Sequence, residues 1–421
     1  MKMKDDSKRI ITGIDIGTTK VCVIIAQWTE DKPLEILGVG KAKSTGLKKG
    51  IVVNISETVT AVNKAVNDAQ KQAGIEVEAA FVGITGDHIR GFNNTGVITV
   101  SKNATRIPTD QQITELDKQR VLEHAQSITL PLDRRILHVL PQEFKVDDHG
   151  GIKDPESMSG HRLEAKVHLV TGAKNTEKNL ASCLEKAGID VISFVVDPLA
   201  SSYSVCDPNE KKLGVALLDI GGGTTDVIVY FDDGVHHTGV IPFGGESITS
   251  DIAHGVQTTL EQAEKLKCQY GIAKEALAST ESDISVQGIG GRQPQTISQK
   301  ELASFIEPRM KEILLIALSE IRKSDHRGGF TFGIVLTGGG ALLSNIEDLA
   351  QEIFHQPTKI GKPIIEMTGL TETILDPTYA TALGLIQYAI EEYDDDYVEN
   401  QWSDKLGTIG SRIRDFFKNL Y

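Results

Sequence analysis

A strand–turn–strand pattern occurs twice in this chain, and the repetition limits the folds available to it. The first copy is "ITGIDIGTTKVCVII", in which Asp15 ends an apolar run and is followed by Gly17, Thr18 and Thr19. The second copy, "VALLDIGGGTTDVIVY", places Asp219 before three glycines and two threonines, about 200 residues later. Each turn joins two apolar strands, so each is expected to be a hairpin tip at a sheet edge. Two such copies predict two homologous halves.

The composition is that of a soluble globular protein with two or more domains. The chain has 421 residues, of which 40% are apolar and 24% are charged. Its formal net charge of -14 argues against nucleic-acid binding, which requires a basic surface. The N-terminus lacks the apolar core of a signal peptide, and no run of about 18 apolar residues is present. Neither the cysteines nor the histidines have metal-ligand spacing. A cytoplasmic protein is therefore expected.

Strand-like and helix-like segments alternate along most of the chain. The expected strands are Ile10–Ile14, Val21–Ala26, Ala80–Ile84, Val167–Val170, Val191–Val196, Val215–Asp219, Val227–Phe231 and Gly333–Leu336. The expected helices are Ile55–Ala73, Glu115–Gln126, Thr176–Ala187, Ser247–Ala253, Leu260–Tyr270, Lys300–Ile321, Asn345–Phe354 and Thr378–Tyr388. This alternation predicts an α/β fold in which helices cover mixed sheets.

Two segments depart from this alternation. Residues 85–166 are polar and rich in turn signals, which predicts a small inserted α+β subdomain. A long functional loop is the alternative, although a loop of this length without its own structure would be unusual. The stretch "EEYDDDYVENQWSD", within residues 391–405, carries seven acidic residues and no basic one. Such a segment repels itself and buries little surface, so a flexible linker is expected there.

The two repeated turns have the chemistry of a phosphate-binding site. Glycines let the backbone N–H groups approach a ligand closely, and threonine hydroxyls add further donors. The predicted phosphate-binding residues are Gly17, Thr18, Thr19, Gly221, Gly222, Gly223, Thr224 and Thr225. Asp15 and Asp219 end their strands beside these turns, where carboxylates are suited to hold Mg²⁺ directly or through water. Lys20 is either a further phosphate contact or a solvated strand residue.

A third glycine-rich turn lies near the end of the chain. "GIVLTGGGALL" contains a strand followed by Gly338, Gly339, Gly340 and Ala341. Glycines here permit a ribose or base to approach the backbone. The chain contains no Walker-type G-x-x-x-x-G-K-[ST], and the triplet does not fit G-x-G-x-x-G, so neither P-loop nor Rossmann chemistry is predicted.

Together the three turns resemble the actin-like ATPase superfamily, which implies ATP with Mg²⁺ as the cofactor. "AEKLK" is similar to the superfamily's A-E-x-x-K, which implies that Glu264 and Lys267 approach the adenosine. Without the resemblance, the pair would be a surface ion pair on one helix face. "DPLASSYSV" resembles the segment whose acid orients the attacking water. Here that acid is Asp197, one methylene shorter than the usual glutamate, and this implies at most a slow ATPase.

The order and spacing of further motifs resemble the FtsA family of bacterial cell-division proteins over essentially the whole chain. These motifs are "DPESMSGHRLEAKVHLVTG", "IPFGGESITSDIA", which adds Gly245 and Glu246 to the nucleotide site, and "FIEPRMKEIL". The resemblance implies two halves with duplicated ribonuclease-H-like cores, an inserted subdomain and a C-terminal amphipathic helix. The implied ranges are 8–84, 167–206 and 365–390 for the first half, 85–166 for the insert, 207–245 and 326–364 for the second half, and 246–325 for its smaller, partner-binding subdomain.

The C-terminal segment 406–421, "LGTIGSRIRDFFKNLY", has the pattern of an amphipathic helix. Its apolar side chains fall within an arc of roughly 140° that basic residues flank. At roughly 24 Å the helix is too short to span a bilayer, and it suits the surface of an anionic membrane. The predicted membrane-contacting residues are Leu406, Ile409, Arg412, Ile413, Arg414, Phe416, Phe417, Lys418 and Leu420. A terminal helix docked on its own domain is the alternative, which the acidic linker disfavours.

The FtsA resemblance also implies partners and a location. The chain is expected to assemble into head-to-tail filaments, to bind the tubulin-like protein FtsZ and to help recruit later division proteins. Its helix would tether it to the cytoplasmic face of the inner membrane at the division site. Glu307 and Arg309, on the helix over Lys300–Ile321, are the candidate partner-binding residues.

Two rival functions remain on the sequence alone. A small-molecule kinase or phosphatase of the same fold would need a further acidic motif beside the γ-phosphate, and it has no use for the terminal helix. A chaperone of the Hsp70 type would need a β-rich domain after the ATPase, for which only about 30 residues remain.

Overall fold

The computed structural model describes residues 8–100, 112–281, 284–288, 290, 293–324, 329–372 and 374–392. The expected helix over 406–421 lies outside the described residues, as does all but the start of the expected acidic linker. No helix within the described residues has the length and hydrophobicity needed to cross a bilayer.

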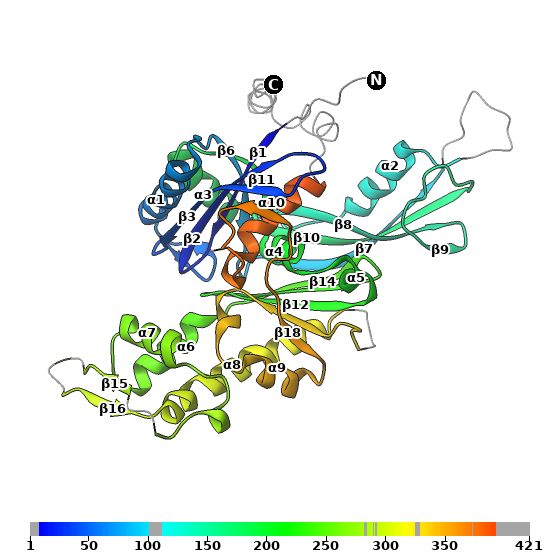
Figure 1. The fold of residues 1–421 in the computed structure, drawn as a ribbon. Coiled ribbons are helices and arrows are strands. Elements are labelled where there is room, and N and C mark those ends of the chain that lie inside the picture. The colour runs from blue at the N-terminus through cyan, green and yellow to red at the C-terminus, as the bar shows by residue number, and fades with distance from the viewer. Residues whose placement is uncertain are drawn as a thin grey trace.

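Two sheets form the body of the molecule, and five strands of the first have the same order as the five strands of the second (Figure 1). The first runs β11 (Asp190–Val196), β6 (Ala79–Ile84), β1 (Arg9–Ile16), β2 (Lys20–Trp28), β3 (Leu34–Lys43) and β19 (Met367–Gly369). The second runs β18 (Thr358–Ile360), β17 (Ile334–Thr337), β12 (Val215–Ile220), β13 (Thr225–Phe231) and β14 (Gly234–Ile241). In both sheets a three-stranded antiparallel meander is followed by two parallel strands. The duplication predicted from the two turns is confirmed.

Helices cover these sheets and separate them. Helix α1 (Ile55–Ala73) packs on β2 and β3; the Asn54 side chain caps its start, and Gly74 ends it with a φ of 67°. Helices α4 (Asp197–Val205) and α10 (Ala380–Glu392) pack against each other, with α10 on β1 and α4 on β12 and β13. The two halves therefore meet through α4 and α10, which lie between the sheets in Figure 1.

An inserted subdomain leaves the first half after β6 and returns to it through α3 (Lys174–Lys186). It contains a sheet in the order β7 (Arg90–Thr99), β10 (Arg162–Ala173), β8 (Arg134–Val146) and β9 (His149–Ile152), and α2 (Glu115–Gln126) covers one face. Its apolar core includes Val121, Phe144 and Leu163. The subdomain projects beside β14 in Figure 1.

A smaller helical subdomain is attached to the second half. It contains α6 (Gly245–Gly255), α7 (Leu260–Tyr270), α8 (Gln299–Ile321) and the hairpin of β15 (Ile284–Val286) with β16 (Gln295–Ile297). Helix α9 (Ile346–Phe354) packs on α8, and α5 (Pro208–Leu213) packs on β13.

Several elements differ from the sequence expectations. Strands β3, β8 and β14 were not expected, because polar residues interrupt their apolar runs. The segment Asp197–Val205, for which no helix was expected, is helix α4 with Pro198 in its first turn. The expected insert boundary at residue 166 falls inside β10, because that strand runs on to Ala173 while pairing with β7 and β8.

Candidate functional site

The two glycine–threonine hairpins close in the same way. In the first, the Gly17 N–H donates to the Lys20 carbonyl at 2.9 Å. In the second, the Gly221 N–H donates to the Thr224 carbonyl at 2.9 Å. In each hairpin, the glycine two residues after the aspartate makes the hydrogen bond that closes the turn. Each aspartate is buried at the end of its strand. The sequence repeat is therefore a repeat of local structure.

The two hairpins lie against each other. A Cβ atom placed on Gly222 would be 2.4 Å from Thr19 Cγ2, and one placed on Gly223 would be 2.4 Å from Thr18 Oγ1. Such distances are well below van der Waals contact, so the absence of side chains at Gly222 and Gly223 is what lets the hairpins meet. The predicted phosphate-binding residues of the two copies are thereby brought into one place.

The third glycine turn packs on the end of β12. Gly338 has a φ of 79°, and a Cβ there would lie 2.3 Å from Asp219 Oδ1. A Cβ on Gly340 would lie 2.3 Å from Ile220 Cγ2. Gly339 and Ala341 complete this turn, which continues into a 3₁₀ helix over Gly339–Leu342. The structure thus places the third glycine-rich turn beside the second hairpin.

Helix α6 begins on the carbonyls of the second hairpin. The Gly245 N–H donates to the Gly221 carbonyl at 2.9 Å, and the Glu246 N–H donates to the Gly222 carbonyl at 2.8 Å. Lys267 on α7 extends back to this helix start, donating to the Gly245 carbonyl at 3.0 Å and forming an ion pair with Glu264 at 2.7 Å. The motif "AEKLK" therefore lies next to the hairpin and braces the start of α6.

Four buried aspartates gather around the two hairpins: Asp15, Asp197, Asp219 and Asp226. Asp219 Oδ2 accepts a hydrogen bond from the Thr381 hydroxyl at 3.1 Å, and Asp226 accepts hydrogen bonds from the Thr85 and Thr224 hydroxyls. Lys20 forms an ion pair with Asp15 at 3.4 Å and donates to the Thr378 carbonyl. One lysine thus faces several carboxylates, and the cluster carries an excess of negative charge.

The pKa values reflect this crowding. Burial and then the charge of Asp15 raise the pKa of Asp219 to about 6, and burial raises the pKa of Asp226 to about 7. Burial, followed by the neighbouring carboxylates, also raises the pKa of Asp197 well above its usual value. Burial alone would lower the pKa of Lys20, but the charges of Asp15 and Asp219 outweigh it and the pKa is raised.

Asp197 has an unsatisfied atom. Its Oδ1 is buried and has no hydrogen-bond partner in the described part of the chain. A buried carboxylate oxygen of this kind is normally satisfied by a water molecule or a cation. Within the described residues, no group of three or more His, Cys, Asp or Glu side chains forms a direct metal site.

Sequence reasoning missed three residues of this site: Asp226, Thr85 and Thr381. Asp226 is the last letter of "DIGGGTTD" and pairs across the hairpin with Asp219, so its position was detectable in the motif. Thr85 and Thr381 carry no local signal, because their contacts with the second half span 141 and 162 residues of sequence.

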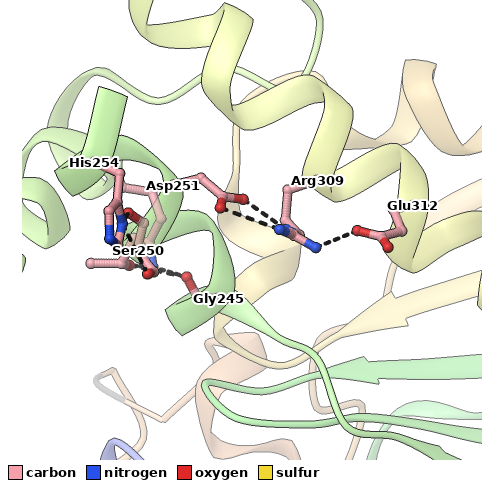
Figure 2. Close-up of polar contacts among 8 residues, drawn as sticks. Gly245, Ser250, Asp251, His254, Arg309 and Glu312 are labelled. Carbon is pink, nitrogen blue, oxygen red and sulfur yellow. Dashed lines mark hydrogen bonds and ion pairs between the residues drawn. The ribbon is translucent and has the colours of Figure 1, made fainter. Parts of the chain in front are cut away.

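The candidate partner-binding residues lie on α8, and the Arg309 guanidinium is 5.8 Å from the ring centroid of Phe243. Arg309 donates to both carboxylate oxygens of Asp251 on α6, at 2.7 and 3.2 Å, and also contacts Glu312, as Figure 2 shows. Glu307 accepts a 2.6 Å hydrogen bond from the Glu275 N–H. Both side chains are therefore engaged within the subdomain. The predicted membrane-contacting residues lie outside the described residues.

Sequence comparisons place the chain among known families. The family model of the cell division protein FtsA matches residues 216–384, and the model of the SHS2 domain inserted in FTSA matches residues 86–171. The cell division protein FtsA of Pseudomonas aeruginosa is 40% identical over 389 residues, covering 92% of this chain and 91% of the relative. That of Escherichia coli strain K12 is 34% identical over 428 residues, covering 100% of both.

Solved structures share the fold at lower identity. The PilM–PilN type IV pilus biogenesis complex matches with a TM-score of 0.62 and 15% identity, covering 90% of this chain and 98% of the other. MreB 5 of Spiroplasma citri bound to AMPPNP matches with a TM-score of 0.55 and 13% identity, covering 93% and 98%. The actin-like ATPase fold expected from the sequence is confirmed. By its fold, its inserted domain and its identity with full-length relatives, the chain belongs to the FtsA family of cell division proteins.

Proposed function

We propose that this chain binds ATP with Mg²⁺ between its two hairpins, self-assembles head to tail, and tethers FtsZ filaments to the cytoplasmic face of the membrane at the division site. One observation carries the nucleotide part of this proposal. The backbones of Gly222 and Gly223 meet Thr18 and Thr19 across the two halves, which supports one site formed by both sets of proposed phosphate-binding groups. The related MreB fold, solved with AMPPNP, supports ATP as the ligand.

The carboxylate cluster fits a nucleotide accompanied by a divalent cation. Mg²⁺ usually keeps several water ligands and binds phosphates together with one or two carboxylates. Asp15 and Asp219 would hold it in this way, and its charge would offset the excess negative charge of the cluster. Asp197, with its unpaired Oδ1, would orient a water molecule toward the γ-phosphate. Its short side chain supports slow hydrolysis, which suits a nucleotide-dependent assembly switch better than a kinase.

Assembly and membrane binding support each other physically. One short amphipathic helix binds a membrane marginally, whereas several helices on one filament bind with a high effective concentration. An ATP-dependent filament would therefore hold the membrane firmly and present many FtsZ-binding surfaces. The α6–α8 face around Arg309 is the proposed FtsZ surface, and Glu307, which contacts Glu275 on another side of α8, is a second proposed FtsZ contact. Later division proteins would be recruited to the same assembly.

Co-sedimentation with vesicles tests this function. The full chain and a truncation ending at residue 405 are incubated with vesicles containing anionic lipid, with ATP or ADP, and with or without FtsZ. The full chain is expected to pellet more strongly with ATP and to carry FtsZ with it, whereas the truncation stays in solution. Equal pelleting of the truncation would refute the tether, and equal pelleting with ADP would refute the nucleotide switch.

A further inference from the structure

The inserted subdomain contacts both halves of the molecule, although the chain connects it to the first half only. Strands β7 and β8 pack along β14, the edge strand of the second sheet (Figure 1). Strand β8 also contacts the first half. His138 Nε2 accepts a 3.2 Å hydrogen bond from the Val196 N–H, and the His138 ring packs edge-on against Tyr388. A single strand thus bridges the two halves.

The contact with the second half is a buried polar cluster. His168 Nδ1 lies 2.7 Å from Asn93 Oδ1, and His168 Nε2 lies 2.9 Å from Thr238 Oγ1. Because Asn93 Oδ1 can only accept, the ring carries its proton on Nδ1, and Thr238 donates to Nε2. Gln142 donates to Asn93 Oδ1 at 3.0 Å and to the Val235 carbonyl at 2.7 Å. His168, Gln142 and Thr238 are buried and Asn93 is half-buried, so the hydrogen bonds that cross to Thr238 and to the Val235 carbonyl are shielded from water.

Two sequence features create this cluster. The pairing of β8 with β10 skips Gln142, so a β-bulge occurs there, and bulges redirect side chains out of the regular pattern. Gly91 lets β7 approach β14, because a Cβ at Gly91 would lie 2.2 Å from Thr238 Oγ1 and 2.6 Å from His168 Nε2. Asn94, the residue after Asn93 on β7, points to the opposite face and donates to the Ala125 carbonyl within the insert.

Strand β14 also connects this cluster to the smaller subdomain. His237, next to Thr238, points to the other side of the strand and contacts Glu320 of α8 at 3.1 Å. The insert and α8 are therefore attached to opposite faces of the same strand.

We propose that the insert is a brace that limits rotation of the two halves about α4 and α10. Strand β8 contacts the first half at His138 and the second half at Gln142, four residues later on one strand of a four-stranded sheet. The two halves therefore cannot move apart without breaking one of these two contacts. Rotation of the halves must therefore break or shear the cluster of Asn93, Gln142, His168 and Thr238. This inference rests on the proposed function only where nucleotide release is concerned.

Distance measurements on the full chain test the brace without nucleotide. Spin labels are placed at Lys64→Cys on α1 and Lys311→Cys on α8, with the exposed Cys268 replaced by Ser. Gly91→Ala and Asn93→Ala are expected to broaden the distance distribution between the halves. Gly150→Ala, whose new Cβ has its nearest neighbour at 3.8 Å, and Asn94→Ala are the matched controls and are expected to leave it unchanged.

Release of a fluorescent ATP analogue gives the second readout. Loss of a buried hydrogen bond is expected to speed release in Asn93→Ala about fivefold to tenfold, with Asn94→Ala at the wild-type rate. Circular dichroism establishes that each variant is folded. An unchanged distance distribution in folded Gly91→Ala would overturn the brace. If neither the wild type nor any variant binds the analogue, the proposed function is contradicted. The distance measurement, which needs no nucleotide, would still test the brace.

Discussion

Thr18 and Gly223 belong to different halves, yet a Cβ atom on Gly223 would lie 2.4 Å from the Thr18 hydroxyl oxygen. The first prediction follows from this contact. Gly223→Ala is expected to push the hairpins apart, and overpacking of this kind costs about 1–3 kcal/mol. Affinity for Mg-ATP, measured by calorimetry, should fall about tenfold or more. Gly150→Ala is the control, and unchanged affinity in a folded Gly223→Ala variant would contradict the two-hairpin site.

The ionised Asp219 carboxylate is expected to destabilise the nucleotide-free protein and to strengthen the binding of Mg-ATP. Its raised pKa means that burial and neighbouring charge disfavour the ionised form in the folded protein. Asp219→Asn is therefore expected to raise the free energy of unfolding at neutral pH by about 1–3 kcal/mol, measured by urea denaturation without nucleotide. The same change should weaken Mg-ATP binding. The exposed Asp190→Asn should alter neither quantity, and a loss of stability in Asp219→Asn would exclude this account of the cluster.

Two buried histidines make an unfavourable contribution to stability in mild acid. Burial lowers the pKa of His138 to about 4 and that of His168 to about 3. Between about pH 6.5 and 4 the unfolded chain binds protons at these histidines that the folded chain does not, so their contribution lowers the free energy of unfolding as the pH drops, opposite in sign to the contributions of Asp219 and Asp226. Each histidine should contribute about 2–4 kcal/mol over this window. His138→Gln should reduce the slope, whereas exposed His149→Gln should leave it unchanged; equal slopes in both variants would contradict the assignment.

Lys49 should retain nucleotide by linking the halves beside the first hairpin, where the neighbouring Gly50 N–H donates to the Thr18 hydroxyl at 3.1 Å. It lies at the tip of the hairpin formed by β4 (Leu47–Lys48) and β5 (Ile51–Val52), with its Nζ 5.0 Å from the ring centroid of Phe243. A cation–π contact of this kind contributes about 0.5–1 kcal/mol at exposed sites. Stopped-flow release of a fluorescent ATP analogue should therefore be about twofold to fivefold faster in Lys49→Ala. The exposed Lys64→Ala on α1 serves as the control, and a wild-type rate in Lys49→Ala would rule out the contact as a latch.

The sequence predicts the elements of the two halves well because each has a strong local pattern. Helix α1 begins at the Asn54 cap and ends at Gly74, and both signals are visible in the sequence. Strand β8 was missed because polar residues interrupt its apolar run, and two of them are buried against the halves: Gln142 contacts the second half and His138 the first. A side chain such as Thr381 cannot be assigned to the site from sequence, because only the packing of α10 between the sheets brings it to Asp219.

A crystal structure of the full chain with Mg²⁺ and AMPPNP tests the central claim most directly. The account predicts phosphates in contact with Gly17–Thr19 and with Gly221–Thr225, and Mg²⁺ held near Asp15 and Asp219. A nucleotide whose phosphates contact one hairpin alone, or which binds elsewhere on the chain, would contradict it.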